Sequence, residues 1–339
     1  MQTSLFGNDT PSKLVKKSGR AVEPVTPDPT LIEMAKNLPA HLRLGTSSWS
    51  YPGWANLVWN GEYSETSLSR YGLPAYTQHP LFRTVSLDRS FYRPLNVAQF
   101  AEYAAQTPGD FRFVVKAPSL ITDALVRDES GRGMRPNRQF LDAAQALQLF
   151  VEPALEGLGH RLGALVFQIS PLPGHWLARM PKLINGLHQL LASIPDLRNN
   201  APDAVVAVEV RDPQWLTPDF VSALRDTGAT YCMGLHAKMP PIDEQLPILR
   251  ALWPGPLVCR WNLNPLHGAY GYEDAHKLYS PYSQIIDPDP KTRAALARVI
   301  NGTAKAGQNV YVTLSNKAEG SAPLSVIELA RAIRSGHQQ

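Results

Sequence analysis

The sequence predicts an α/β fold: a single (β/α)8 barrel of the TIM type, preceded by an N-terminal arm outside its core. Two observations support this fold class. Short, almost wholly apolar segments recur along the chain, and amphipathic helical segments alternate with them. This alternation is typical of α/β proteins, and continuous apolar runs suit parallel strands that are covered on both faces. A count of eight runs favours a closed barrel over an open sheet.

The arm and the barrel differ in composition. The chain has 339 residues, a length that one α/β barrel can reach as a single domain. Residues 1–40 lack apolar periodicity and are rich in Pro, Ser and Thr, so we expect a poorly ordered or surface-draped arm. The arm also carries a basic cluster formed by Lys13, Lys16, Lys17 and Arg20. Residues 41–335 form the predicted barrel domain.

The predicted strands follow one another at intervals along that domain. They cover residues 42–46, 82–87, 111–116, 162–168, 204–210, 230–235, 256–261 and 309–314. Most are rich in Val, Ile, Phe or Tyr and are too apolar for half-exposed strands, so we expect them to be buried on both faces.

Four of the intervening segments carry helix signals. Residues 181–194 place apolar side chains on one face, namely Leu183, Ile184, Leu187, Leu190, Leu191 and Ile194. Thr217 and Pro218 begin a second helix as N-cap and first-turn proline, and Gly228 ends it. A third helix is predicted from the spacing of Phe140, Ala144, Leu147 and Val151. Ser321 caps a last one, with an inward face of Leu324, Ile327 and Ala330.

Three connections are longer than bare barrel loops. They are residues 49–66, which are aromatic and irregular, 121–137, which are charged, and 263–290, which are rich in Tyr, Pro and His. Each follows a predicted strand, so each rises above the C-terminal face of the barrel, where this fold builds its pockets.

Polar side chains collect at the same ends of the predicted strands. They are Asp88, Lys116, Gln168, Glu209, Arg211, His236, Arg260, Asn262 and Asn316. In a barrel these positions meet at one end of the axis. Glu209, Arg211 and Arg260 lie in otherwise apolar surroundings, and pairing the carboxylate with Lys116 or a guanidinium offsets the cost of burial. The sequence therefore predicts a polar, partly cationic pocket.

This pocket suits a small anionic ligand. Two guanidiniums and an ammonium bind phosphate, sulfate or carboxylate groups through charged hydrogen bonds. We expect Glu209, Lys116 and Asp88 to be catalytic, with a carboxylate as general base and Lys116 or Arg260 stabilising negative charge. The expected ligand-binding residues are Arg211, Arg260, Gln168, Tyr92, Trp49, Tyr51, Asn262, Asn316 and His236. Trp49 and Tyr51 lie in an aromatic loop that is either a lid or a stacking surface.

Several other classes of protein and site find no support. No apolar run approaches the length of about 20 residues that spans a bilayer, and the N-terminus lacks the apolar core of a signal peptide. The chain contains no HExxH, paired CxxC, GxGxxG, P-loop or GxSxG motif, so we predict no metal site and no cofactor. Cys232 and Cys259 each lie in an apolar run, and we expect buried free thiols in a cytoplasmic protein.

Several segments, in order, resemble those of the DUF72 (YecE-like) family: GTSSWSYPGW, TVSLDRSFYR.P, FRFVVKAPSLIT, LGALVFQISP, AVEVRDPQW and SNKAEGSAP. The resemblance spans about residues 42–333 and implies a TIM barrel whose activity is not established. A general similarity of the family to metal-dependent endonuclease and sugar-isomerase barrels suggests nucleic acids or sugar phosphates as partners. The positions that match the family pattern are Trp49, Tyr51, Trp54, Phe91, Tyr92, Arg93, Lys116, Thr122, Gln168, Glu209, Arg211, Trp215, Arg260 and Asn316.

Other positions depart from that pattern. Ser86 and Asp88 replace the Glu and Asn of the second-strand motif, and Asp123 replaces a His. Asn262 stands where an Arg-x-His-Gly motif has its His, and Ser315 replaces the first residue of an Asn-Asn pair. These departures remove a carboxylate, two imidazoles and an amide, so the resemblance implies an altered substrate or a loss of activity.

Three functions stay open on the sequence. The first is an enzyme of the hydrolase or isomerase type that acts on a small phosphorylated or carboxylated, sugar-like molecule. The second is a nucleic-acid-binding barrel, although the formal net charge of only +4 weighs against it. The third is a ligand-binding member of the family without catalytic activity. We expect no membrane partner, and the sequence does not predict an oligomeric state.

Overall fold

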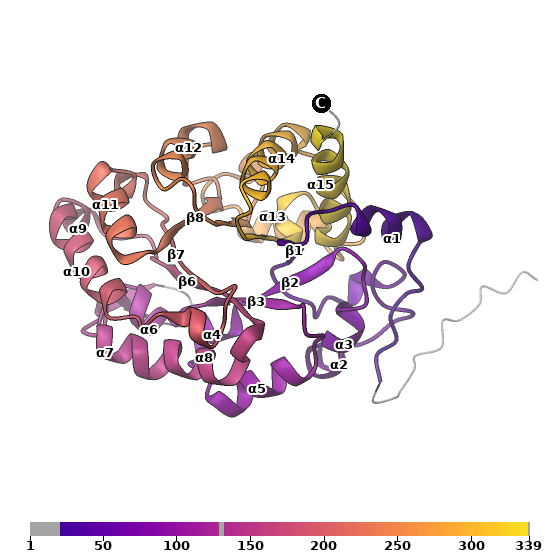
Figure 1. Cartoon of the computed structure of the whole chain (residues 1–339), viewed down its shortest axis with the longest axis horizontal. Coiled ribbons are helices and arrows are strands. Elements are labelled where there is room, and N and C mark those ends of the chain that lie inside the picture. The colour runs from indigo at the N-terminus through magenta and orange to yellow at the C-terminus, as the bar shows by residue number, and fades with distance from the viewer. Residues whose placement is uncertain (1–20, 129–131, 338–339) are drawn as a thin grey trace, which may run out of the picture.

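The computed structural model describes residues 21–128 and 132–337, and these residues form a ring of strands surrounded by helices (Figure 1). The basic cluster Lys13, Lys16, Lys17 and Arg20 of the expected arm lies outside the described residues. Residues 21–40 include a helix, α1 (Pro29–Lys36), that begins at the side-chain cap of Asp28. They are held to the barrel domain by a backbone hydrogen bond of 3.0 Å from Val25 to Val58.

Eight parallel strands close into a barrel, which confirms the predicted fold class. The strands are β1 (Leu42–Thr46), β2 (Phe82–Leu87), β3 (Arg112–Lys116), β6 (Leu162–Gln168), β7 (Val205–Glu209), β8 (Thr230–Leu235), β9 (Leu257–Trp261) and β10 (Val310–Leu314). Their order around the barrel is β1-β10-β9-β8-β7-β6-β3-β2. The predicted strand bounds agree with these to within one residue, because each apolar run stops where the strand leaves the core.

The inside of the barrel is packed with side chains and is not a channel. Seven buried residues fill it: Val114, Ala164, Val166, Ala207, Cys232, Val258 and Tyr311. At the N-terminal end of the strands, Asp203 binds Arg43 at 2.9 Å and Arg112 at 2.7 Å. This core and the ion pairs beneath it leave the C-terminal strand ends as the open end of the barrel. Cys232 and Cys259 are free and buried, as expected.

The outer helices alternate with the strands. The longer ones are α5 (Val97–Ala105), α8 (Glu152–Leu158), α10 (Met180–Ala192), α11 (Pro218–Thr227), α12 (Ile242–Ala251), α14 (Pro290–Lys305) and α15 (Ala322–His337). Shorter ones are α2 (Glu65–Tyr71), α3 (Leu73–Tyr76), α4 (Arg89–Tyr92), α6 (Ser119–Thr122), α7 (Ala143–Ala146), α9 (Gly174–Leu177) and α13 (Tyr272–Tyr279). Single 3-10 turns occur at Pro52–Trp54, Gly159–Arg161, Leu197–Asn199, Pro213–Trp215, Pro265–His267 and Asn316–Ala318.

Two of the four predicted helices agree closely with the structure. The expected inward residues of α10 are buried, apart from Ile194 beyond its end, which is half-buried. In α11, the Thr217 hydroxyl accepts a hydrogen bond from the Phe220 amide, and Gly228 ends the helix with a φ of 70°. A positive φ of this size is readily adopted only by glycine, so the sequence marks this helix end clearly.

The other two helices differ from the prediction in detail. A π-helical turn, Leu147–Val151, joins α7 to α8, and its wider spacing buries Ala146, Phe150 and Val151 while Ala144 is exposed. At α15, Ser321 precedes the first residue, but its hydroxyl has no hydrogen-bond partner among the described residues. The Asn316 side chain instead accepts from the Ala322 amide at 2.8 Å, so the cap comes from the preceding turn.

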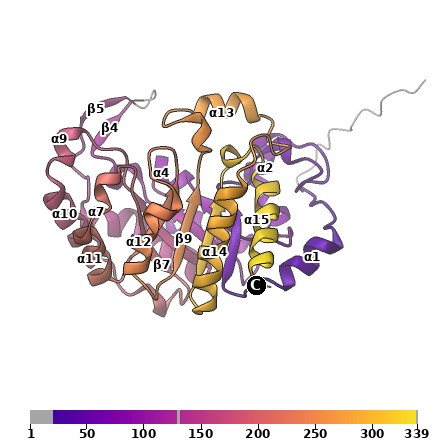
Figure 2. The same ribbon diagram turned by 90° about the horizontal axis from the view of Figure 1, so that it is seen from above.

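Two of the long connections rise at the same end of the barrel. Figure 2 shows α13 and a small hairpin, β4 (Leu125–Arg127) with β5 (Gly133–Pro136), at the edge where the strands end. The aromatic segment 49–66 is packed down instead, since Trp54 and Trp59 are fully buried. These segments form the walls around the open end of the barrel.

Candidate functional site

A cavity of about 640 Å³ opens at the C-terminal ends of the strands. We call it the mouth cavity. It is lined by Ser47, Ser48, Tyr51, Asp88, Phe91, Tyr92, Lys116, Gln168, Pro171, Arg211, His236, Lys238, Arg260, Asn262, Ala269, Tyr270, Tyr272, Ser315 and Lys317. Most of the expected site residues are therefore brought together here, from strands that lie far apart in the sequence.

Glu209 lies beneath the floor of the mouth cavity, at the end of β7. Its side chain is 0% exposed, and its two oxygens lie 2.7 Å from Arg211 Nη2 and 2.8 Å from Arg260 Nη1. Burial raises the pKa of Glu209, but the two guanidiniums outweigh this effect and hold the pKa below its ordinary value. A Cβ atom at Gly234 of β8 would lie only 3.0 Å from Glu209 Oε1, so this glycine leaves room for the carboxylate.

Arg260 links this buried carboxylate to a second one. Its Nη2 donates to both oxygens of Asp88, at 2.8 and 2.6 Å, while its Nη1 binds Glu209. The Ser86 hydroxyl donates to the same Asp88 carboxylate at 2.6 Å. Gln168 accepts from Arg211 at 3.1 Å and from Arg260 at 3.3 Å, so its amide oxygen bridges the two guanidiniums. These contacts fix the floor of the cavity through charged hydrogen bonds.

Lys116 reaches the same floor from the end of β3. The Ser90 hydroxyl lies 2.6 Å from the Lys116 carbonyl oxygen, which fastens α4 to β3 and brings Phe91 over the lysine. The ammonium nitrogen lies 3.5 Å from the centre of the Phe91 ring. Burial, together with the charges of Arg260 and Arg211, lowers the pKa of Lys116 to about 7, although Asp88 and Glu209 oppose the shift. The lysine is therefore divided between ammonium and amine near neutral pH.

His236 adds a neutral imidazole to the wall. Its Nδ1 accepts a hydrogen bond of 3.0 Å from the Lys238 amide, which leaves Nε2 as the protonated nitrogen. Burial and then the charge of Arg211 lower its pKa to about 4. The residue thus offers a neutral hydrogen-bond donor, and not a cation, at physiological pH.

The rim of the mouth cavity is aromatic and basic. Tyr92 and Tyr270 are 83% and 86% exposed, unusually high values for large aromatic side chains. The Lys238 ammonium lies 4.4 Å from the centre of the Tyr270 ring, and the Lys317 ammonium lies 5.7 Å from that of Tyr282. Flat faces and cations at the entrance can hold a ligand that combines a ring with an anion.

Three expected site residues do not line the mouth cavity. Glu209 is covered by the arginines, as described above. Trp49 is buried and donates from Nε1 to the Leu68 carbonyl oxygen at 3.1 Å. Asn316 is buried below the surface, where its side-chain oxygen accepts from Trp54 Nε1 at 3.1 Å and also caps α15. Tyr51 does line the cavity, beside Trp54 at a ring-centre distance of 4.9 Å.

The positions that depart from the family pattern have distinct surroundings. Ser86 binds Asp88, so these two departures form one unit on the floor. The amide group of Asn262 donates to Glu209 at 3.2 Å. Ser315 lines the cavity wall. Asp123 does not, since it is buried against Arg127 at 2.6 Å at the base of the β4–β5 hairpin.

Sequence reasoning missed four basic or aromatic residues of the wall: Lys238, Tyr270, Tyr272 and Lys317. They lie in the connections after β8, β9 and β10, where no periodicity indicates the direction of a side chain. The richness in Tyr of residues 263–290 was the one available indication, because that connection follows a strand. Phe91 was named in the sequence analysis only as a position that matches the family pattern, and not as the ring against a lysine.

The described residues contain neither a metal-binding cluster nor a membrane-spanning helix. Among them, no group of three or more His, Cys, Asp or Glu side chains is arranged to hold a metal ion. No helix within residues 21–128 and 132–337 is long and apolar enough to cross a membrane.

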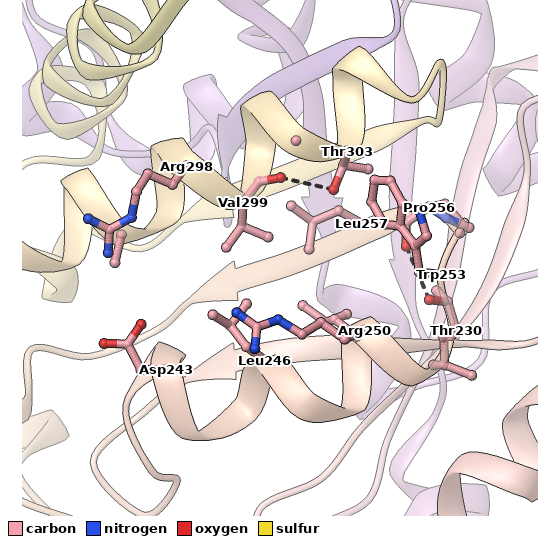
Figure 3. A pocket seen from close by; sticks show the side chains of 15 residues that line it. Thr230, Asp243, Leu246, Arg250, Trp253, Pro256, Leu257, Arg298, Val299 and Thr303 are labelled. Atoms are coloured by element: carbon pink, nitrogen blue, oxygen red, sulfur yellow. Dashed lines mark hydrogen bonds between the residues drawn. The ribbon is translucent and has the colours of Figure 1, made fainter. Parts of the chain in front are cut away.

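A second cavity, of about 420 Å³, lies outside the barrel between α12 and α14 (Figure 3). Its wall is mainly apolar, with Leu246 and Val299 facing it from the two helices. It also touches Thr230 and Leu257, the first residues of β8 and β9, so it lies toward the N-terminal ends of the strands. In this fold that end serves stability, and the C-terminal end carries the chemistry. The mouth cavity is therefore the candidate site.

Comparisons with known proteins agree with the fold. Residues 43–339 match the family described as "Protein of unknown function DUF72". A DUF72 family protein from Enterococcus faecalis V583 is similar in structure, with a TM-score of 0.53 at 17% identity over 86% of this chain and 95% of that one. One from Thermotoga maritima MSB8 gives a TM-score of 0.44 at 17% identity, over 88% and 99% of the two chains. A comparison with curated proteins found no match.

Proposed function

Because this chain belongs to the DUF72 family, whose function is unknown, we propose from the geometry of its mouth cavity that it is an enzyme for a small phosphorylated or carboxylated molecule. A sugar-like compound is the substrate class that suits the aromatic rim, and a proton-transfer reaction of the isomerase or hydrolase type suits the residues on the floor. The observation that carries the proposal is an excess of cations over carboxylates around one cavity.

The charges at the mouth cavity do not cancel. Arg211 and Arg260 are balanced by the two carboxylates of Glu209 and Asp88. The remaining basic side chains are Lys238, Lys317 and Lys116, which is only partly protonated near pH 7, and within the described residues no ion pair involves any of them. Since a cluster of like charges is unfavourable unless an anion joins it, these three lysines favour a ligand with one or two negative charges.

The residues take different roles in this proposal. Arg211, Lys238 and Lys317 hold the anionic group of the ligand. Lys116 is the catalytic group, because an amine with a pKa of about 7 can take up and release a proton at physiological pH. Glu209 touches no ligand, since it is fully buried, and it acts as a positioning residue that holds the two arginines. Asp88 is the carboxylate on the floor that a ligand can reach.

A thermal-shift screen with phosphorylated and carboxylated sugars and organic acids at constant ionic strength tests this proposal. A ligand that binds the native state raises the melting temperature, and 100 times its Kd adds about 2.7 kcal/mol of stability. We expect a shift in the native protein that is reduced in Lys238→Met and Lys317→Met. The matched control is Lys305→Met, which changes an exposed lysine at the end of α14, away from the mouth.

The contrary result is equally clear. If every anion shifts the melting temperature of the native protein no more than it shifts those of Lys238→Met and Lys317→Met, the mouth cavity is not an anion site. If ligands bind but are recovered unchanged after long incubation, the protein is a ligand-binding member of the family and the enzymatic part of the proposal is wrong.

The exposed tyrosines favour one alternative, a nucleic-acid-binding barrel. Tyr92 and Tyr270 can stack on bases while Lys238 and Lys317 contact phosphates. Binding of this kind weakens steeply with salt, with one lost counterion for each phosphate contact. A titration with single-stranded oligonucleotides between 50 and 200 mM salt separates the two functions, because a small anion held by two or three lysines gives a much shallower dependence.

A further inference from the structure

The surroundings of the Lys116 amine differ from those of the other lysines whose ion pairs or ring contacts the structure describes. Lys277 forms an exposed ion pair of 2.8 Å with Glu273, and Lys238 reaches an exposed tyrosine at the rim. Lys116 is 9% exposed, ends a central strand and lines the floor of the mouth cavity. The contact described for its amine is with the face of Phe91, which offers weak attraction to a cation and no hydrogen-bond acceptor for a proton.

The arginines explain why this lysine lacks a carboxylate. Arg260 donates to both oxygens of Asp88, and Arg211 and Arg260 together occupy both oxygens of Glu209. Both carboxylates of the floor are therefore paired with arginines, and neither forms an ion pair with Lys116. Burial and the neighbouring guanidiniums favour the neutral amine, whose lone pair is available for chemistry at neutral pH.

We propose that Lys116 is a nucleophile that forms an imine with an aldehyde or ketone group of the anionic substrate. This inference rests on the proposed function and narrows its substrate class to carbonyl compounds, such as the open form of a sugar phosphate or an oxo acid. The surrounding cations hold the anionic group, and the carbonyl carbon then lies against the amine on the floor.

The bond changes balance without any further reagent. The Lys116 nitrogen attacks the carbonyl carbon, and the carbonyl π bond breaks to give a carbinolamine. Two protons pass from nitrogen to oxygen through water, the C–O bond breaks, and the oxygen leaves as one molecule of water. The carbon–nitrogen double bond that results takes up one proton from solvent. Its positive charge then withdraws electrons from the adjacent carbon, whose proton becomes easier to remove.

Pyridoxal 5′-phosphate is a suitable probe, because it joins an aldehyde to a phosphate in one small molecule. The full-length protein is incubated at pH 7 with a small excess of this probe, treated with borohydride to reduce any imine, digested, and mapped by mass spectrometry. We expect the reduced adduct on Lys116 to form at least ten-fold faster than on Lys277 and Lys305, which are exposed and serve as internal references. Inorganic phosphate should slow the reaction at Lys116 and leave the reference lysines unaffected.

Two variants sharpen the experiment. Lys116→Arg keeps the positive charge but removes the nucleophile, so it should lose the fast adduct while it still binds sulfate. Lys238→Met tests whether a rim lysine is the reacting group: its adduct should still map to Lys116, but it should form more slowly, because Lys238 helps to hold the phosphate of the probe. A native protein in which Lys116 reacts no faster than Lys277 would overturn the inference. If the native protein gives that result but binds sulfate in the mouth cavity, only the inference about Lys116 is wrong. If the native protein does not bind sulfate there, the inference and the proposed function are both wrong.

Discussion

Replacing Glu209 by Gln tests how the floor of the mouth cavity is held together. The substitution keeps the size of the side chain and removes one buried charge. In the native protein, two guanidinium nitrogens at 2.7 and 2.8 Å and the Asn262 amide at 3.2 Å point at the Glu209 carboxylate. Removing one partner of a buried ion pair costs about 3–5 kcal/mol, because the other charge is left uncompensated. For a domain of this size that corresponds to a fall of roughly 10 °C in melting temperature.

The pH dependence of this loss has a definite sign. The guanidiniums hold the pKa of Glu209 below its ordinary value, even though burial acts in the opposite direction. A carboxylate with a lowered folded-state pKa stabilises the protein above its unfolded pKa of about 4.3, and that stability is lost as the pH falls through the folded pKa. Urea unfolding should therefore show a large difference between the native protein and Glu209→Gln at pH 7 that shrinks below pH 4.

The control for this experiment is Asp203→Asn at the other end of the barrel. Asp203 also binds two arginines, but its side chain is 30% exposed, so we expect a smaller loss of stability. Unfolding of Glu209→Gln at the same urea concentration as the native protein at pH 7 would contradict this role of the carboxylate. Equal losses of stability in the two variants would contradict it as well.

Three further predictions concern the neighbouring residues. Lys116→Met should raise the free energy of unfolding at pH 7 by about 2–4 kcal/mol, and the gain should shrink toward pH 10, because burial and the arginines lower the lysine's folded-state pKa to about 7. A less stable variant at pH 7 would contradict this. Calorimetric titration with sulfate should show several-fold weaker binding at pH 8.5 than at pH 6, since Lys116 loses its proton while Glu209 stays ionised, Arg260 stays charged and His236 stays neutral. Lys116→Met should abolish that dependence. Asn316→Ala should cost about 2–3 kcal/mol of stability, because Trp54 and the Ala322 amide lose their acceptor, and should leave sulfate binding unchanged; weaker binding would place Asn316 in the site.

The barrel could be predicted because its strands are buried on both faces. Continuous apolar runs such as residues 162–168 have no polar alternation, and each ends at the residue where the chain leaves the core. Helix phase was harder to predict. The π-helical turn before α8 changes which residues face inward, and nothing in the local composition marks it. The helix α1 lies in the segment for which we expected no periodicity, but Met34 is buried, and Leu31, Ala35 and Leu38, at helical spacing, pack against the core.

The site was predictable only in its position along the barrel axis. A polar residue after a strand must lie at the C-terminal end, and this rule brought Lys116, Arg211 and Arg260 to one cavity. The rule does not say whether a side chain turns toward the cavity or back into the structure. Asn316 turns back to cap α15, and its partner Trp54 comes from a loop more than two hundred residues earlier. Such long-range pairing leaves no pattern in a single sequence.

A crystal of the native protein soaked in sulfate would test the central claim most directly. We expect a sulfate ion in the mouth cavity, within hydrogen-bond distance of Arg211 and at least one of Lys116, Lys238 and Lys317. The same soak of a Lys238→Met, Lys317→Met double variant should show weaker density or none. Sulfate bound elsewhere on the surface, with an empty mouth cavity in the native protein, would contradict the claim that this cavity is an anion site.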